Sequence, residues 1–379
     1  MNWKPSSLYP QLIILVQRLY LRYRWCDASH PFWVFYWQWK EQGASLVREF
    51  IEGRYQSQPK MGYNAYGHRD PLYLYQDALL QKILYRIIKP TFKHIISPAC
   101  HHLKGPGVIK KVAHEITDAL ELGRYRYVIR TDIKSYYASI NHTILQNMIR
   151  SHFDDERVAR YLCDAIDAPI DRGGWYEHPH KGISIRSSLS GLFAALYLKP
   201  LDLTFDHRDD IFYCRYNDDI LILCQTKRQY ARAKKRLKMI VRSLQLTLAP
   251  KKTQMGQLNK GFHFLGIQYD VAQTMTSVKK SQHPLDPIKV SLHPRSIRRS
   301  IDKIRRKQEE MALLKGHQSS AEHPANVHRL RYRWANWWAR QHGQLSDKLA
   351  HIHAWIQMAS WVGHVKSCNY NLRRLNERP

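Results

Sequence analysis

The segment IFYCRYNDDILIL, at residues 211–223, constrains the fold more than any other part of this chain. Two runs of apolar, β-prone residues flank a polar Asn-Asp-Asp tip, which predicts a tight β-hairpin with the carboxylates at its turn. Adjacent acids between two buried strands are electrostatically costly unless a cation lies beside them. Taken alone, the segment leaves two interpretations open: a metal-binding turn, or a hairpin whose Asn and Asp only provide turn geometry.

A second acidic segment favours the metal-binding interpretation. In RYRYVIRTDIKSYYASI, Asp132 ends a β-prone run and is followed by two aromatic residues and a predicted helix start near Asn141. Phosphoryl transfer with two metal ions needs carboxylates from separate elements, because ions about 4 Å apart must bridge the attacking and leaving oxygens. We therefore expect Asp132 and Asp218 to meet at one point.

Charge and cysteine use limit the partners and the compartment. The 379 residues include 60 Lys and Arg against 31 Asp and Glu, a formal net charge of +29, which predicts nucleic acid as the partner. The longest apolar stretches, LIILV and residues 32–39, are too short to span a bilayer, so no membrane is expected. Six scattered cysteines without a CxxC pair, and an N-terminus without signal-peptide order, predict a reduced cytoplasmic protein without structural zinc.

Hydrophobic periodicity divides the chain into a helical start, a mixed middle and a basic helical end. Residues 8–55 and 75–89 are predicted helices, with Pro90 expected to stop or kink the second. Strands and helices alternate from residue 125 to about 270, which predicts a mixed sheet backed by helices. At residues 295–307, isoleucines at helical spacing with cations on the other faces predict an amphipathic basic helix.

Five segments occur in the order DIKSYYASI, GISIRSSLSGLFAALYL, RYNDDILIL, LTLAPKKT and GFHFLGIQY. In this order they resemble the palm motifs of bacterial reverse transcriptases, including those of group II introns, retrons, diversity-generating retroelements and phage-defence systems. The resemblance implies an α+β right-hand polymerase. Its implied parts are an N-terminal helical extension (1–40), fingers (41–125), a palm with a mixed sheet backed by helices (126–275), and a helical basic thumb with C-terminal helices (276–379).

The resemblance also implies the reaction and its metal ligands. A primer 3′-hydroxyl, or a protein hydroxyl, would attack the α-phosphate of a deoxynucleotide with two Mg²⁺ ions bound, for which Mn²⁺ can substitute. Asp132 and Asp218 match the family's metal-binding aspartates. Asp219 matches their supporting neighbour, and the Ile133 carbonyl matches a further ligand.

Substrate-binding residues follow from the same resemblance. Tyr137 matches the aromatic that stacks under the incoming sugar and blocks a 2′-hydroxyl, which implies a DNA product; a core aromatic beside Tyr136 is the alternative. The residues assigned to the dNTP are Tyr137, Arg69, Lys104, Arg186 and Lys252, the last near the leaving pyrophosphate or simply solvated. Those assigned to template and primer are Gly182, Tyr216, Asn217, Gly266, Arg298, Arg299, Lys303 and Arg306, the last four on a basic helix that a solvated face would also explain.

One motif departs from the family pattern. Family members commonly carry Pro, Gly and then Gln or Pro where this chain has Ser184, Arg186 and Gly191, which suggests a specialised enzyme. With no long DNA-binding sequence expected after the thumb, we favour an enzyme copying a dedicated non-coding RNA, with a role in antiphage defence. The alternatives are a reverse transcriptase of a diversity-generating or intron-derived retroelement, a non-catalytic RNA-binding scaffold, and an RNA-synthesising enzyme, which Tyr137 disfavours. The implied partners are template RNA, DNA product and dNTPs, with a protein partner and a homo-oligomer both left open.

Overall fold

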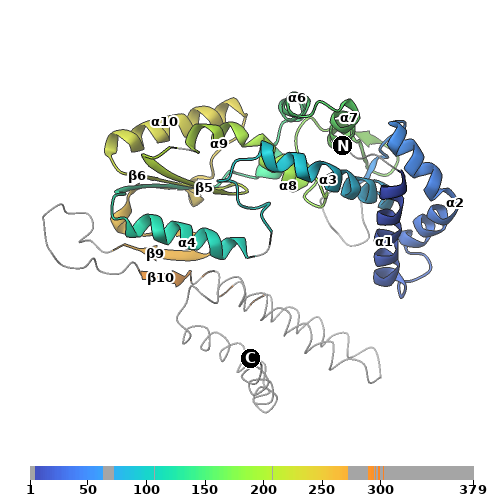
Figure 1. Cartoon of the computed structure of the whole chain (residues 1–379), viewed down its shortest axis with the longest axis horizontal. Coiled ribbons are helices and arrows are strands. Elements are labelled where there is room, and N and C mark those ends of the chain that lie inside the picture. The colour runs from blue at the N-terminus through green and yellow to red at the C-terminus, as the bar shows by residue number, and fades with distance from the viewer. Residues whose placement is uncertain are drawn as a thin grey trace, which may run out of the picture. The chain divides into compact units, whose positions relative to one another are not determined.

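The computed structural model describes residues 5–62, 72–105, 107–206, 208–271 and 289–293, together with Arg295, Arg298 and Asp302. The chain forms two compact units, each assembled from separate stretches of sequence (Figure 1). Unit 1 comprises Met1–Leu103, Thr131–Arg208 and Arg232–Lys252. Unit 2 comprises Lys104–Arg130, Asp209–Ala231 and Thr253–Pro379.

Unit 1 begins with three helices, α1 (Pro5–Tyr23), α2 (Pro31–Glu52) and α3 (Tyr75–Ile95). Helix α2 starts where Nδ1 of His30 accepts from the backbone N–H of Phe32, and it ends at Gly53, whose φ of 79° glycine tolerates. The predicted helices are confirmed, but α3 continues through Pro90 to Ile95, so the expected stop there is wrong. The buried residues Ile83, Leu84, Ile88 and Phe92 form one continuous stripe, and we infer that their packing outweighs the hydrogen bond that proline removes.

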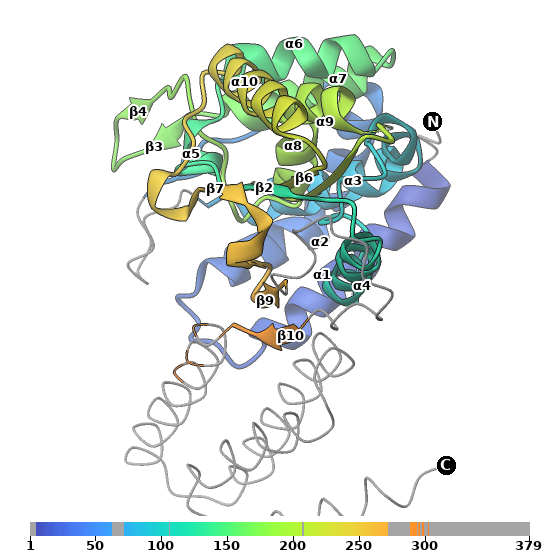
Figure 2. The same cartoon turned by 90° about the vertical axis from the view of Figure 1, so that its left-hand side faces the viewer.

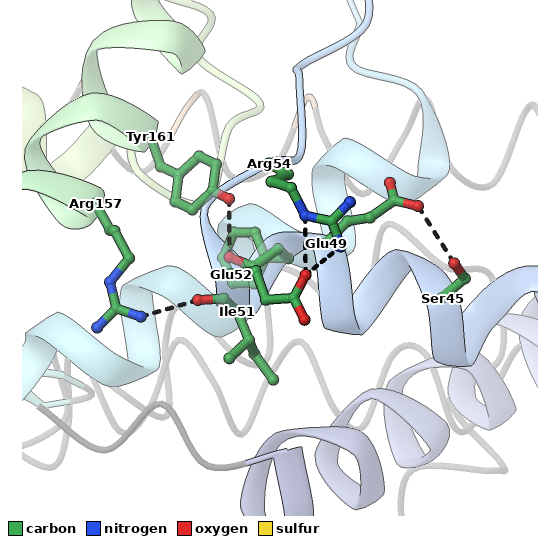
Figure 3. Close-up of polar contacts among 8 residues, drawn as sticks. Ser45, Glu49, Ile51, Glu52, Arg54, Arg157 and Tyr161 are labelled. Atoms are coloured by element: carbon green, nitrogen blue, oxygen red, sulfur yellow. Dashed lines mark hydrogen bonds and ion pairs between the residues drawn. The ribbon is translucent and has the colours of Figure 1, made fainter.

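The C-terminal end of α2 is bound by side chains of α7 (Glu156–Asp167), as Figure 3 shows. The Tyr161 hydroxyl donates to the Phe50 carbonyl at 2.8 Å, and Nη1 of Arg157 donates to the Ile51 carbonyl at 2.9 Å. The last carbonyls of a helix have no partner inside the helix, so these bonds both cap α2 and join it to α7.

The rest of unit 1 consists of short helices and a small sheet. Helix α8 is buried along its whole length. A three-stranded sheet has the order β1-β3-β4. The elements are β1 (Lys60–Met61), α5 (Tyr136–Ser139), α6 (His142–His152), β3 (Ile170–Asp171), β4 (Tyr176–Glu177), α8 (Ser190–Tyr197), α9 (Lys199–Phe205) and the 3-10 turn η1 (Pro250–Lys252). Helix α10 (Lys227–Ser243) has residues in both units.

Unit 2 contains two sheets with a helix between them. The larger sheet has the order β5-β6-β2-β7, and Figure 2 shows its last three strands side by side. Helix α4 (Val108–Glu121) packs its apolar face into one core with both sheets, and Figure 1 shows it running between them. The strands are β2 (Tyr127–Thr131), β5 (Ile211–Tyr216), β6 (Asp219–Cys224) and β7 (Gln254–Gln257) in the larger sheet, and β8 (Phe262–Phe264), β9 (Ile267–Asp270) and β10 (Lys289–Leu292) in the smaller, with the 3-10 turn η2 (Leu258–Lys260) before β8.

This combination of helices and antiparallel strands confirms the α+β class. No helix in the described ranges is both long and apolar enough to cross a bilayer. Of the predicted basic helix, the structure describes Arg295, Arg298 and Asp302, which are helical and exposed. The remaining residues of that helix and the Trp-rich segment after it lie outside the described residues. The boundaries at residues 40, 125 and 275 stay predictions.

Candidate active site

The β5–β6 hairpin of unit 2 carries two of the candidate acids at its turn. The predicted hairpin is confirmed, but its connection is Asn217 and Asp218 alone, because Asp219 of the expected three-residue tip pairs with Tyr216 as the first residue of β6. Asn217 has a φ of 57°, a conformation that asparagine adopts more readily than most residues. Its side-chain amide donates to Oδ1 of Asp218 at 2.8 Å. The turn therefore holds a carboxylate at a defined place at the end of the sheet.

A buried arginine supports this turn, and the sequence analysis missed it. Arg215 lies in β5 opposite Ile220, has 0 % of its surface exposed, and donates from Nη1 to the Asn217 carbonyl at 2.9 Å. A guanidinium is rarely buried unless it is hydrogen-bonded, because its desolvation is costly. The signal available in the sequence was one cation inside an otherwise uncharged β-prone run.

Asp132, in unit 1, directly follows β2 and is 6 % exposed. Its carbonyl accepts from the Ala249 backbone at 2.8 Å, and Ile133 forms a bridge with Leu248. Its carboxylate Oδ2 accepts from Nζ of Lys252 at 2.6 Å. The backbone of Asp132 is thus fixed, while its charge is balanced by a lysine whose side chain is 61 % exposed.

Strands β2 and β6 are neighbours in the larger sheet, and a backbone hydrogen bond shows their relative direction. The Arg126 backbone N–H, just before β2, donates to the carbonyl of Cys224, the last residue of β6, at 2.9 Å. The beginning of β2 therefore lies beside the end of β6, and the two neighbouring strands run antiparallel. Among the described residues, no three His, Cys, Asp or Glu side chains are grouped so as to hold a metal ion. The convergence of Asp132 with Asp218 stays a prediction.

Two further predicted residues are brought together within unit 1. The Ile183 backbone N–H donates to the carbonyl of Tyr137 at 2.9 Å, and that of Gly182 donates to the carbonyl of Ile140 at 2.8 Å. Backbone hydrogen bonds thus join the segment of Tyr137 to the loop that carries Gly182. Tyr137 is half-buried, whereas the neighbouring Tyr136 is buried and donates its hydroxyl to the Ala194 carbonyl at 2.6 Å. Tyr136 is therefore the core aromatic of the pair.

The Gly182 loop rests on a histidine that the sequence analysis did not single out. Nε2 of His142 hydrogen-bonds the Gly182 carbonyl at 2.7 Å, and its Nδ1 lies 3.6 Å from Oδ1 of Asp167. Burial is the main cause that lowers the pKa of His142, which keeps the ring neutral and Nε2–H as the donor. Gly182 has a φ of 96°, a conformation in which a side chain would be strained.

The departing motif forms a serine-rich turn at the start of α8. Ser187 donates from its hydroxyl to Oε1 of Gln81 on α3 at 2.8 Å and accepts from the Leu189 backbone at 3.0 Å. Arg186 is exposed beside this anchored serine. A Cβ on Gly191 would lie 3.3 Å from Leu103, whose segment approaches α8 closely. A larger residue at position 191 would therefore need the Leu103 side chain to move slightly.

The other predicted residues are dispersed or undescribed. Gly266, with Leu265, forms the β8–β9 turn at φ values of 83° and 49°, typical of a two-residue hairpin, and its carbonyl accepts from His293 at 2.9 Å. Tyr216 is half-buried, and burial raises the pKa of its hydroxyl. Lys104 and Arg298 are exposed. The residues outside the described ranges are Arg69, Arg299, Lys303 and Arg306.

Comparison with known proteins defines the class of this protein. Residues 73–269, just over half of the 379, match the family model described as reverse transcriptase (RNA-dependent DNA polymerase). The chain therefore belongs to the reverse transcriptase family. It is an RNA-directed DNA polymerase, and the predicted α+β polymerase fold is confirmed. Reverse transcriptases generally use divalent metal ions.

Two individual proteins are similar to part of this chain. Protein YkfC of Escherichia coli (strain K12) is 25 % identical over 269 residues, which cover 58 % of this chain and 69 % of YkfC. A solved structure titled as apo telomerase from Candida tropicalis, truncated from the C-terminal domain, is 15 % identical with a TM-score of 0.39. That similarity covers 52 % of this chain and less than half, 45 %, of the telomerase chain.

Proposed function

We propose that the chain adds deoxynucleotides by a two-metal mechanism, with two Mg²⁺ ions held by Asp132, Asp218, Asp219 and the carbonyl of Ile133. The observation that carries the proposal is the strand order: Asp132 follows β2, Asp218 and Asp219 stand where β6 begins, and β2 and β6 are antiparallel neighbours. The donors are carboxylate and carbonyl oxygens, which suit Mg²⁺ and equally Mn²⁺. When bound, such ions stabilise the negative charge that develops on the phosphoryl oxygens.

The chain's own cations would serve the triphosphate. Lys252 lies against Asp132, where an ammonium group can neutralise a leaving pyrophosphate. We assign the same task at the other phosphates to Arg69, Lys104 and Arg186, of which Lys104 and Arg186 are exposed.

Sugar selection and strand binding would fall to residues on rigid backbone. The backbone carbonyl of Tyr137 accepts from Ile183 beside Gly182, which restrains the backbone that carries the ring proposed to exclude a 2′-hydroxyl. We assign template and primer contacts to Gly182, Tyr216, Asn217 and Gly266, and phosphate contacts along the duplex to Arg298, Arg299, Lys303 and Arg306. The phosphate contacts weaken as the salt concentration rises.

A primer-extension assay tests this mechanism. Purified protein would be given a primed RNA template, Mg²⁺ and labelled dNTPs or rNTPs, and the wild type would be compared with Asp218→Ala and Tyr137→Ala. Of the wild type and Asp218→Ala, we expect only the wild type to make DNA. Tyr137→Ala should increase the ratio of rNTP to dNTP use about tenfold, since one excluded group is worth about 1–3 kcal/mol. Equal polymer from Asp218→Ala would contradict the metal assignment, and polymer made only from rNTPs by the wild type would contradict the sugar assignment.

We further propose that this cytoplasmic enzyme copies a dedicated non-coding RNA in antiphage defence. Support comes from the departing motif, where Ser184, Arg186 and Gly191 stand in place of the residues that family members commonly carry. Sequencing of RNA that co-purifies with the protein should return one abundant species, and plaque counts should rise when Asp218→Ala replaces the wild type in a protected host. Heterogeneous RNA with unchanged plaque counts would favour the retroelement alternative.

A further inference from the structure

The helical hairpin of α1 and α2 exposes an aromatic surface that the reverse transcriptase match, which begins at residue 73, does not cover. Trp37 is 56 % exposed in α2, and Trp25, in the turn between the helices, is 84 % exposed. We define the aromatic surface as Tyr20, Trp25, Trp33, Tyr36 and Trp37. Water-exposed tryptophans are costly, so their presence calls for a partner or a packing role.

The packing role of α2 is already filled by other rings. Its buried aromatics are Phe32, Phe35, Trp39 and Phe50, and the rings of Phe32 and Phe35 lie 5.8 and 5.4 Å from that of Tyr75 on α3. Trp33, Tyr36 and Trp37 are less buried, and the rings of Trp33 and Tyr36 lie 5.3 and 5.6 Å from that of Phe32. Helix α2 therefore carries partly exposed rings that rest on its buried ones.

Four of the five rings of the aromatic surface, all but that of Trp25, contact one another. Tyr20 on α1 lies 6.3 Å from Trp33 and stacks on Tyr36 at 5.2 Å, and Tyr36 lies 5.6 Å from Trp37. The indole N–H of Trp33 donates to the Cys26 carbonyl at 3.5 Å, next to Trp25. The rings are thus fixed relative to one another, which lowers the entropy lost when a partner stacks on them.

Cations lie beside two of these rings. Nζ of Lys40 lies 4.5 Å from the ring centre of Trp37, and the guanidinium of Arg24 lies 5.0 Å from that of Trp25. Residues 18–41, which contain the aromatic surface, include four Lys and Arg and two acids, Glu41 and Asp27, of which Asp27 already accepts from the Ser29 backbone. Such a surface attracts an anion that also offers flat apolar faces.

We propose that the aromatic surface binds single-stranded nucleic acid, with bases stacked on Trp25 and Trp37 and phosphates held by Arg24 and Lys40. Stacking on aromatic side chains with cations along the backbone is the usual way of binding single strands without reading their sequence. A duplex hides its base faces and fits this surface less well. The strand could be template RNA or product DNA, since both offer the same bases and phosphates.

The test measures binding of the full chain to fluorescent oligonucleotides of about 12 nucleotides, a length within the usual range of single-strand sites. The arms are single-stranded RNA, single-stranded DNA and an RNA duplex, without divalent ions or dNTPs. We expect Trp37→Ala and Trp25→Ala each to weaken single-strand binding about tenfold, because each variant removes one ring on which a base would stack. Lys40→Gln should weaken it less, and Lys40→Arg should restore it. The arm that shows the larger loss identifies RNA or DNA as the strand.

Trp175→Ala is the matched control, because Trp175 is 60 % exposed on the small sheet of unit 1 and lies outside the aromatic surface. Thermal unfolding checks that each variant is folded. Single-strand binding by Trp37→Ala and Trp25→Ala equal to that of the control would overturn the proposal. So would unchanged binding with a changed molar mass by light scattering, which would make the surface a contact between copies of the chain. Asp218→Ala should retain binding, so failure of the polymerase proposal is distinguishable from failure of this one.

Discussion

The two segments that carry the candidate acids are held in opposite ways. The β5–β6 turn of unit 2 rests on Arg215, a cation with no exposed surface that donates to the Asn217 carbonyl. Asp132 of unit 1 has a fixed backbone, but its carboxylate is paired with the exposed Lys252. A buried guanidinium cannot leave its partner without a large desolvation cost, whereas a solvated lysine can. The β5–β6 turn therefore has a permanent support in Arg215, whereas Asp132 has a counter-charge, Lys252, that can leave it.

The largest expected effect comes from removing either carboxylate. Asp132→Asn and Asp218→Asn should each lower the rate of nucleotide addition by about 10³-fold or more, because metal-borne charge stabilisation is worth several kcal/mol and each 1.36 kcal/mol is a factor of ten. Single-turnover extension measures it. Substantial activity in one of the two variants would show that the segments are unequal in chemistry as well as in support.

Replacing Arg215 tests the permanent support. Arg215→Met should lower the free energy of unfolding by about 3 kcal/mol, because the Asn217 carbonyl loses a charged donor inside the fold. Chemical denaturation measures the change. The control, Arg228→Met, alters an exposed arginine at the start of α10 and should stay within about 0.5 kcal/mol of the wild type. If both variants behave alike, the turn does not depend on its buried cation.

Acidification tests the support of the Gly182 loop in unit 1, where His142 is buried and neutral. Burial lowers the pKa of His142 below its usual 6.5, so the unfolded chain binds a proton there before the folded protein does. Its contribution to stability is therefore fully present above pH 6.5 and is lost as the pH falls from 6.5 toward the folded pKa. Unfolding at pH 7.5 and 5.5 should show a smaller acid-induced loss for His142→Gln than for the wild type. The same loss in both would assign the acid sensitivity to other groups.

The smallest effect on stability is expected at the exchangeable partner. Lys252→Gln should change the free energy of unfolding by less than about 1 kcal/mol, since exposed ion pairs contribute little. The variant should reach half-maximal activity at a lower Mg²⁺ concentration, because Asp132 no longer pairs with an ammonium group. A titration of initial rate against Mg²⁺ checks this, and Lys252→Arg is the control that keeps the charge. An unchanged Mg²⁺ requirement would mean that Lys252 does not compete for Asp132.

Local patterns were predicted where neighbours in sequence decide the outcome. The hairpin at Asn217 and Asp218 and the helix start at Asn141, whose side chain accepts from Ile144, follow from turn and capping preferences. The prediction that the helix could stop at Pro90 was wrong because the buried stripe of α3 continues past that residue. The supports at Arg215 and His142 were missed because a partner in a buried network leaves no periodic signal.

The sequence by itself carried the resemblance to reverse transcriptases, in five motifs and their order, and it predicted the β5–β6 turn, because the residue types at that turn decide its local geometry. Tertiary structure alone decided that Lys252 lies against Asp132, 120 residues away in the chain, and that His142 bonds the Gly182 carbonyl. It also decided which aromatics of α2 are buried and which form the exposed aromatic surface. Burial depends on what packs against a residue, and that partner is set by the whole fold rather than by adjacent residues.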